Sequence, residues 1–127
     1  MATILVAEDD LHILRVISLW LKRNGHEVAE ARTGPDALAQ LRAGGVDLMV
    51  TDVNMPGMTG LDLLTTATAE GLLPRGAIVL TSRCDQQEIA DAVRAQGGLV
   101  HPKPFSPSRL LATIENKLAA AAAPAAT

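Results

Sequence analysis

The sequence predicts an α/β fold, a doubly wound parallel sheet with helices on both faces. Short apolar, strand-like runs alternate with segments of helical periodicity five times along the chain. The third run, over residues 46–52, is almost continuously apolar, as in a strand that is covered on both faces. Because right-handed crossovers place each helix against the sheet, strict alternation predicts parallel strands between two layers of helices.

The first two strand–helix units are defined by composition and by their end signals. Residues 3–7 form a β-branched and aliphatic run, typical of a buried strand. Residues 11–24 carry apolar side chains at helical spacing, and Gly25 follows where a left-handed helix cap is expected. Residues 27–31 alternate like a strand, and the short helix predicted over 35–41 has a proline in its first turn.

The remaining three units follow the same alternation. Strands are predicted over 46–52, 77–81 and 99–101, and helices over 61–69, 86–96 and 109–122. Leu61, Leu64 and Thr68 lie on one side of the first of these helices, which predicts its inner face. Ser106 and Pro107 resemble an N-cap and a first helical residue, so they predict where the last helix opens.

Length, charge and composition narrow the function classes. A chain of 127 residues fits one domain, and no apolar run approaches the ~18 residues of a membrane span. The amino terminus lacks the pattern of a secretory signal, so we expect a soluble, cytoplasmic protein that is not bound to a membrane. The formal charge of −3 and the presence of only two aromatic residues argue against a nucleic-acid partner. The single cysteine, Cys84, excludes an internal disulfide and a cysteine-based zinc cluster.

Polar residues collect where four of the predicted strands end. Ligands of doubly wound sheets bind beyond the carboxyl ends of the strands, where the strand order reverses. These strand ends carry Glu8 and Asp9, Asp52, Thr81 and Ser82, and Lys103 and Pro104. We therefore expect them to share one edge of the sheet.

Three carboxylates in one pocket repel one another, so they should either raise a carboxyl pKa or hold a cation. Mg²⁺ prefers oxygen ligands and often takes only one or two carboxylates. Asp9 and Asp52 are the best candidates for direct ligands, Glu8 would lie behind them, and the Asn54 backbone carbonyl is available from the following loop. An ammonium and a hydroxyl beside such an ion, from Lys103 and Thr81, suit a phosphoryl group.

These motifs together resemble those of a known family. Glu8-Asp9, Asp52 within TDVNMPGMTG, Thr81-Ser82 and Lys103-Pro104-Phe105 resemble the receiver domain of bacterial two-component response regulators, the CheY-like family. The resemblance runs from residue 3 to about residue 120, so we expect a receiver domain over 1–120 and an alanine-rich tail over 121–127. It also implies the flavodoxin-like strand order 2-1-3-4-5, for which the chemotaxis receiver is a known example.

The resemblance implies a role for each matching residue. Asp52 would accept a phosphoryl group from a sensor histidine kinase or a histidine phosphotransfer protein, with Mg²⁺ or Mn²⁺ held by Asp9, Asp52 and the Asn54 carbonyl and with Glu8 behind them. Lys103 would pair with the phosphoryl group or, before transfer, with Asp52. Thr81 and Ser82 would bind phosphoryl oxygens, and a cis bond at Pro104 would aim Lys103 into the pocket.

The same resemblance implies which residues set the lifetime of the phosphoryl group and which surface binds the downstream target. Asn54 and Arg83 would flank the path of the hydrolytic water and modulate dephosphorylation, with Arg83 slowing it. Where the family commonly carries an aromatic switch residue, three residues before Lys103, this chain has Val100. A downstream target protein would bind the surface of the fourth helix, the fifth strand and the last helix.

Several readings remain open at this point. The first is a single-domain receiver that signals by phosphorylation-dependent protein contacts and catalyses only its own phosphorylation and dephosphorylation, and so is not an enzyme. That reading leads; the alternatives are a receiver cut from a longer regulator or hybrid kinase, and a binding module that works without phosphorylation. A phosphatase of the haloacid dehalogenase type is disfavoured, because Asn54 occupies the place of its second catalytic aspartate.

Overall fold

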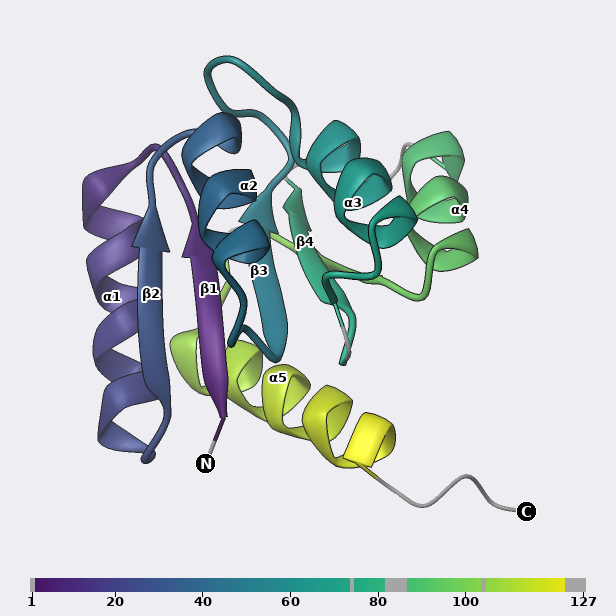
Figure 1. Ribbon diagram of the computed structural model, residues 1–127. Coiled ribbons are helices and arrows are strands. Elements are labelled where there is room, and N and C mark those ends of the chain that lie inside the picture. Colours follow the sequence, from purple (N-terminus) through teal and green to yellow (C-terminus); the bar gives the residue numbers. More distant parts are fainter. Residues whose placement is uncertain (1, 74, 82–86, 104, 123–127) are drawn as a thin grey trace.

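The computed structural model describes residues 2–73, 75–81, 87–103 and 105–122. Strands and helices alternate along the chain (Figure 1). The elements are β1 (Thr3–Ala7), α1 (Leu11–Arg23), β2 (Glu27–Ala31), α2 (Gly34–Ala43), β3 (Leu48–Asp52), α3 (Gly60–Ala69), β4 (Ala77–Thr81), α4 (Gln87–Ala95), β5 (Leu99–Pro102) and α5 (Pro107–Ala122). The predicted α/β alternation is confirmed.

The strands form one parallel sheet in the order β2-β1-β3-β4-β5, as expected. After β1 the chain moves outward to β2 and then returns to the other side of β1 to form β3. The strand order therefore reverses between β1 and β3, whose register pairs Ala7 with Thr51 at their carboxyl ends. This switch point is where a doubly wound sheet places its ligands.

Two apolar cores lie on opposite faces of the sheet, because successive side chains of a strand point to opposite sides. On one face, α1 and α5 pack against Ile4, Val6, Val50 and Leu80. On the other face, α2, α3 and α4 pack against neighbouring strand residues such as Met49. Figure 1 shows this sandwich of helices around the central strands. Among the described helices, none is long and apolar enough to cross a membrane.

Side-chain caps mark where the first two helices begin, and a glycine marks where α1 ends. The Asp10 carboxylate accepts hydrogen bonds from the backbone N–H groups of His12 and Ile13 and so caps α1. Gly25 follows α1 with φ 84°, the left-handed conformation that was predicted for it. The Thr33 hydroxyl caps α2 in the same manner by accepting from the N–H of Asp36.

The predicted inner face of α3 is wrong in part. Leu64 is buried and Leu61 is partly buried against the core, but Thr68 is exposed. The face toward the sheet is instead completed by Leu63 and Ala67, both fully buried. The helix is rotated about its axis relative to the prediction because Leu63 and Ala67 bury more apolar surface than the threonine would.

Candidate metal centre

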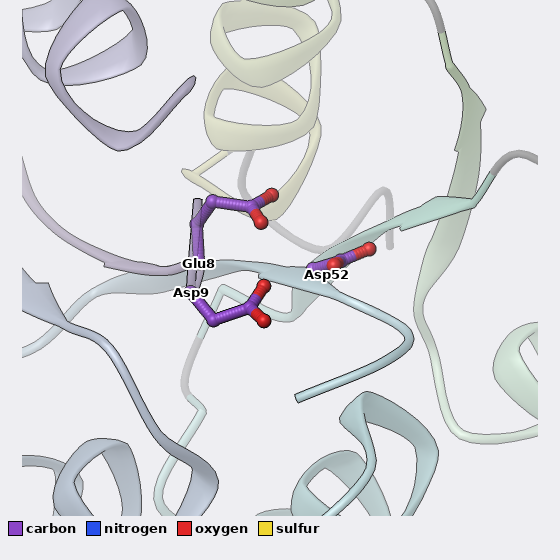
Figure 2. A group of neighbouring side chains, drawn as sticks. All are labelled: Glu8, Asp9 and Asp52. Carbon is purple, nitrogen blue, oxygen red and sulfur yellow. The ribbon is translucent and has the colours of Figure 1, made fainter. Parts of the chain in front are cut away.

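Three carboxylates meet at the switch point of the sheet. Glu8 and Asp9 follow β1 directly, and Asp52 is the last residue of the neighbouring strand β3. One ligand oxygen of each residue lies within 4.8 Å of the others. Figure 2 shows the side chains of Glu8 and Asp9 reaching from the end of β1 to the side where Asp52 ends β3. The structure thus brings these three predicted residues together.

The three acids differ strongly in exposure. Glu8 is 1% exposed and Asp52 9%, whereas Asp9 is exposed. Glu8 is held in place because its N–H donates to the Ala31 carbonyl at 3.0 Å, and its Oε1 accepts from the Asp10 N–H at 3.2 Å. The site therefore has a buried acid at its back and an exposed acid at its rim.

Lys103 provides the positive charge of the site. It follows β5, where its N–H donates to the Thr81 carbonyl at 2.9 Å. Its Nζ donates to Glu8 Oε2 at 2.9 Å and lies 3.3 Å from Asp52 Oδ1. Sequence reasoning paired Lys103 with Asp52 alone and missed the shorter bond to Glu8. Ninety-five positions separate Glu8 from Lys103, so no local pattern could have indicated that bond.

Electrostatics set the charge states. Burial, supported by the charge of Asp52 and opposed by hydrogen bonds from Lys103 and the Asp10 N–H, raises the pKa of Glu8 to about 7. Burial lowers the pKa of Lys103, but its bond to Glu8 and the charges of Asp52 and Glu8 outweigh burial and raise it overall. Lys103 is therefore charged near neutral pH, while the Glu8 carboxyl exchanges its proton in that range.

The donor set fits a hard divalent cation. Carboxylate oxygens are the ligands that Mg²⁺ and Mn²⁺ prefer, and one lysine does not balance three neighbouring acids. Glu8 is already bonded to Lys103 and to a backbone N–H, which leaves Asp9 and Asp52 as the more available ligands. Asn54 lies two residues beyond Asp52, at an exposed position in the loop before α3.

Of the remaining predicted residues, two are described by the structure and three are not. Thr81 ends β4, is 1% exposed, and follows Leu80, the register partner of Asp52, so it lies at the same edge. Val100 is half-buried and packs against the core on the side of α3 and α4. Ser82, Arg83 and Pro104 lie outside the described residues.

One neighbouring contact was not expected from the sequence. On β5, the His101 ring packs edge-on against Phe105, with ring centroids 6.3 Å apart, and its Nδ1 lies 3.5 Å from the Thr113 hydroxyl of α5. Burial lowers the pKa of His101. A strand residue that faces a helix over 10 positions later gives no periodic signal, so only the folded chain shows it.

Comparison with known proteins places the site in a family context. The sequence profile of the response regulator receiver domain matches residues 4–115. The chemotaxis protein CheY of Pseudomonas aeruginosa is 36% identical over 114 residues, which cover 88% of this chain and 92% of that protein. The response regulator GtcR of Aneurinibacillus migulanus is 32% identical over 117 residues, and this chain spans about half of its length, 47%.

Solved structures agree with these relatives. The chemotaxis response regulator CheY4 of Vibrio cholerae matches with a TM-score of 0.84 and 31% identity, over 93% of this chain and 99% of that one. A CheY-like receiver domain protein from Methanospirillum hungatei matches with a TM-score of 0.86 and 29% identity, over 95% of this chain and 96% of that one. The fold is thus shared with receiver proteins of solved structure.

Proposed function

The chain belongs to the response regulator receiver domain family, and we propose that Asp52 is the carboxylate on which it accepts a phosphoryl group. A receiver domain is a phosphoacceptor in two-component signalling, not a classical enzyme, and its family implies a histidine kinase as partner. The acidic cluster is typical of the receiver Mg²⁺ site. We propose the role of each individual residue in this chain.

The position of Asp52 between the acids and Lys103 carries the assignment. Asp52 belongs to the three-carboxylate cluster and also pairs with the Lys103 ammonium at 3.3 Å. Both oxygens of Glu8 already accept hydrogen bonds, and Glu8 is almost fully buried. Asp52 keeps 9% exposure, against 1% for Glu8, and has a neighbouring cation, so it is the better placed of the two to meet a phosphoryl group that arrives from solvent.

The proposed transfer is a displacement at phosphorus. A carboxylate oxygen of Asp52 forms the new O–P bond while the N–P bond to the donor imidazole breaks. The electron pair of that bond returns to the ring, whose other nitrogen carries a proton, so the donor leaves as neutral imidazole. Asp9, Asp52 and the Asn54 carbonyl, with Glu8 behind them, would hold Mg²⁺ or Mn²⁺, which would supply positive charge beside the transferring oxygens. Lys103 moves its contact from Asp52 to the new phosphoryl oxygens.

Thr81 and Lys103 report the modified state. The Thr81 hydroxyl lies one residue beyond the register partner of Asp52, so a rotation about its side chain brings it onto a phosphoryl oxygen. Ser82 would assist there by binding a phosphoryl oxygen. Val100 replaces an aromatic, so output depends on Thr81 and on packing around β5. We expect Thr81→Ala to retain phosphorylation and to lose binding of a phosphorylation-dependent partner.

Partner contacts and lifetime complete the proposal. The phosphoryl donor is a sensor histidine kinase or a histidine phosphotransfer protein, and the target protein binds the α4-β5-α5 surface. Asn54 and Arg83 modulate hydrolysis, so Arg83→Ala should dephosphorylate faster than the wild type. An unchanged or slower rate in that variant contradicts the shielding role.

Intact mass after incubation with acetyl phosphate tests the function. With Mg²⁺, the wild type should gain the mass of one phosphoryl group, while Asp52→Asn and a chelated sample gain none. Asp62→Asn, which changes an exposed acid in the first turn of α3, should behave like the wild type. Failure to gain mass and failure to bind beryllofluoride would together contradict the proposal and favour a module that binds without phosphorylation.

A further inference from the structure

The loop over residues 53–59 contains Asn54 and joins β3 to α3. Its first residue is bonded to the sheet, because the Val53 N–H donates to the Leu80 carbonyl of β4 at 3.0 Å. Its two ends are bonded to each other, because the Gly60 N–H donates to the Val53 carbonyl at 2.8 Å. Met55 is buried at 9% exposure within the core. The tip of the loop, at Gly57 and Met58, extends beyond these anchors.

The tip lies directly against the first turn of α2. A Cβ atom added at Gly34 would overlap Met58 Cβ and stand 2.8 Å from the Met58 carbonyl oxygen, closer than side chains pack. A Cβ at Gly57 would in turn stand 3.2 Å from the Pro35 ring. Two close approaches, one from each side, show that the loop tip and α2 share a tight contact.

Space, and not backbone conformation, requires glycine at position 34. Gly34 is absent from the residues with positive φ, so its backbone is one that any residue adopts. Alanine is also the better helix former at a helical position. Only the approach of Met58 therefore disfavours a side chain there.

The α2 side of this contact is firmly held. The Thr33 hydroxyl caps α2, and Pro35 fixes the backbone in the first turn. The preceding strand is bonded to the site itself, since the Glu8 N–H donates to the Ala31 carbonyl. A group inserted at position 34 should therefore move the loop tip more than the helix.

We propose that Gly34 is a positioning residue for the metal centre, because its missing side chain seats Met58 and so fixes the loop that presents the Asn54 carbonyl beside Asp52. This inference rests on the proposed function, in which that carbonyl is a ligand. Gly34 touches neither the ion nor the phosphoryl group, and it acts through the loop alone. Misplaced outer contacts typically weaken metal binding by about tenfold or more.

Gly34→Ala tests the role, with Gly98→Ala as a matched control. Gly98 directly precedes β5, at the end of the sheet away from the acidic edge, and it also has no positive φ. A Cβ atom added at Gly98 would stand 2.8 Å from a methyl group of Val93 in α4. Both variants therefore receive the same atom in a similarly crowded place. The measurements are backbone amide shifts of the metal-free proteins by NMR and the Mg²⁺ dissociation constant by calorimetry.

Gly34→Ala should shift the amides of residues 53–59 and raise the Mg²⁺ dissociation constant by about tenfold. Gly98→Ala should leave the loop amide shifts and the Mg²⁺ dissociation constant unchanged, even if its melting temperature falls. Unmoved loop amides or an unchanged dissociation constant in Gly34→Ala would overturn the role. If that variant does not fold, Met58→Gly, which removes the contact without adding atoms, must weaken Mg²⁺ binding instead, and unchanged affinity there overturns the role as well.

The wild-type titration separates this inference from the proposed function. A wild-type chain that binds no Mg²⁺ overturns both, whatever happens to the loop amides. A wild-type chain that binds Mg²⁺ and takes up phosphate, with equal affinity in Gly34→Ala, overturns the positioning role alone.

Discussion

The two ends of the parallel sheet both carry polar side chains, but these side chains have different partners. At the amino ends of the strands, Asp47 Oδ2 accepts from the Thr3 N–H at 2.9 Å, and Lys117 Nζ donates to the Gly97 carbonyl at 2.6 Å. At the carboxyl ends, Lys103 binds Glu8 and Asp52. These two contacts at the amino end complete backbone hydrogen bonds, whereas the two contacts of Lys103 at the carboxyl end set charges against one another.

The difference explains why only one end is suited to chemistry. A backbone group is a neutral partner in a fixed place, so a side chain bonded to it has one stable arrangement. A lysine between two acids can be rearranged by an incoming ion or phosphoryl group, because each new charge changes the preferred pairing. The carboxyl end of the sheet is therefore the responsive end.

Replacing Lys103 or Lys117 should show the largest contrast in stability between the two ends of the sheet. At pH 8 without metal, Lys103→Met leaves the buried Glu8 carboxylate without its cation, so we expect the free energy of unfolding to fall by about 3 kcal/mol. Lys117→Met removes one hydrogen bond to a carbonyl and should cost about 1 kcal/mol. Urea denaturation of both variants measures the difference. Equal losses would contradict the contrast between the two ends.

The titration of Glu8 should appear in stability. Its pKa is about 7 in the folded chain, above the ordinary 4.5, so the folded state holds the proton more tightly. The stability that this supplies is complete below pH 4.5 and is lost as the pH rises through 7. From pH 5 to pH 8 in chelator, the wild type should therefore lose about 2 kcal/mol relative to Glu8→Gln. Parallel pH profiles for the two proteins would contradict the raised pKa.

The fold was largely predictable because its signals are local or periodic. Apolar runs, Gly25 after α1 and Ser106-Pro107 at the start of α5 marked elements whose bounds the structure places within a few residues of expectation. The strand order was confirmed, but it came from the family resemblance. Thr68 was misplaced because small and apolar residues surround α3 on two adjacent faces, so the spacing alone left its rotation open.

The acidic edge was predictable as a group, whereas its pairings were not. Parallel strands bring their carboxyl ends together, which gathers Glu8, Asp9 and Asp52 whatever their rotamers. Which acid binds Lys103 depends on side-chain reach within that group. The contact between Met58 and Gly34 could not be predicted either, because a glycine in a helical segment does not indicate which residue packs against it.

Added metal should stabilise the responsive end. At pH 8, Mg²⁺ at ten times its dissociation constant should raise the free energy of unfolding by about 1 kcal/mol, since it binds the folded chain alone. Asp9→Asn should lose most of this gain. Denaturation across a Mg²⁺ series measures it, with sodium chloride at matched ionic strength as the control. An equal gain from the sodium salt would mean general screening and not a site.

The smallest effect is expected at the amino end of the sheet. Asp47→Ala removes the acceptor of the Thr3 N–H, and because that end is partly exposed, water can replace the carboxylate in part. The free energy of unfolding should fall by about 0.5–1 kcal/mol, while the rate of phosphorylation by acetyl phosphate stays unchanged. Asp91→Ala, an exposed acid on α4, provides the baseline for removing a surface charge. A slower phosphorylation rate in Asp47→Ala would show that the two ends of the sheet are coupled, and the division between a structural end and a responsive end would then fail.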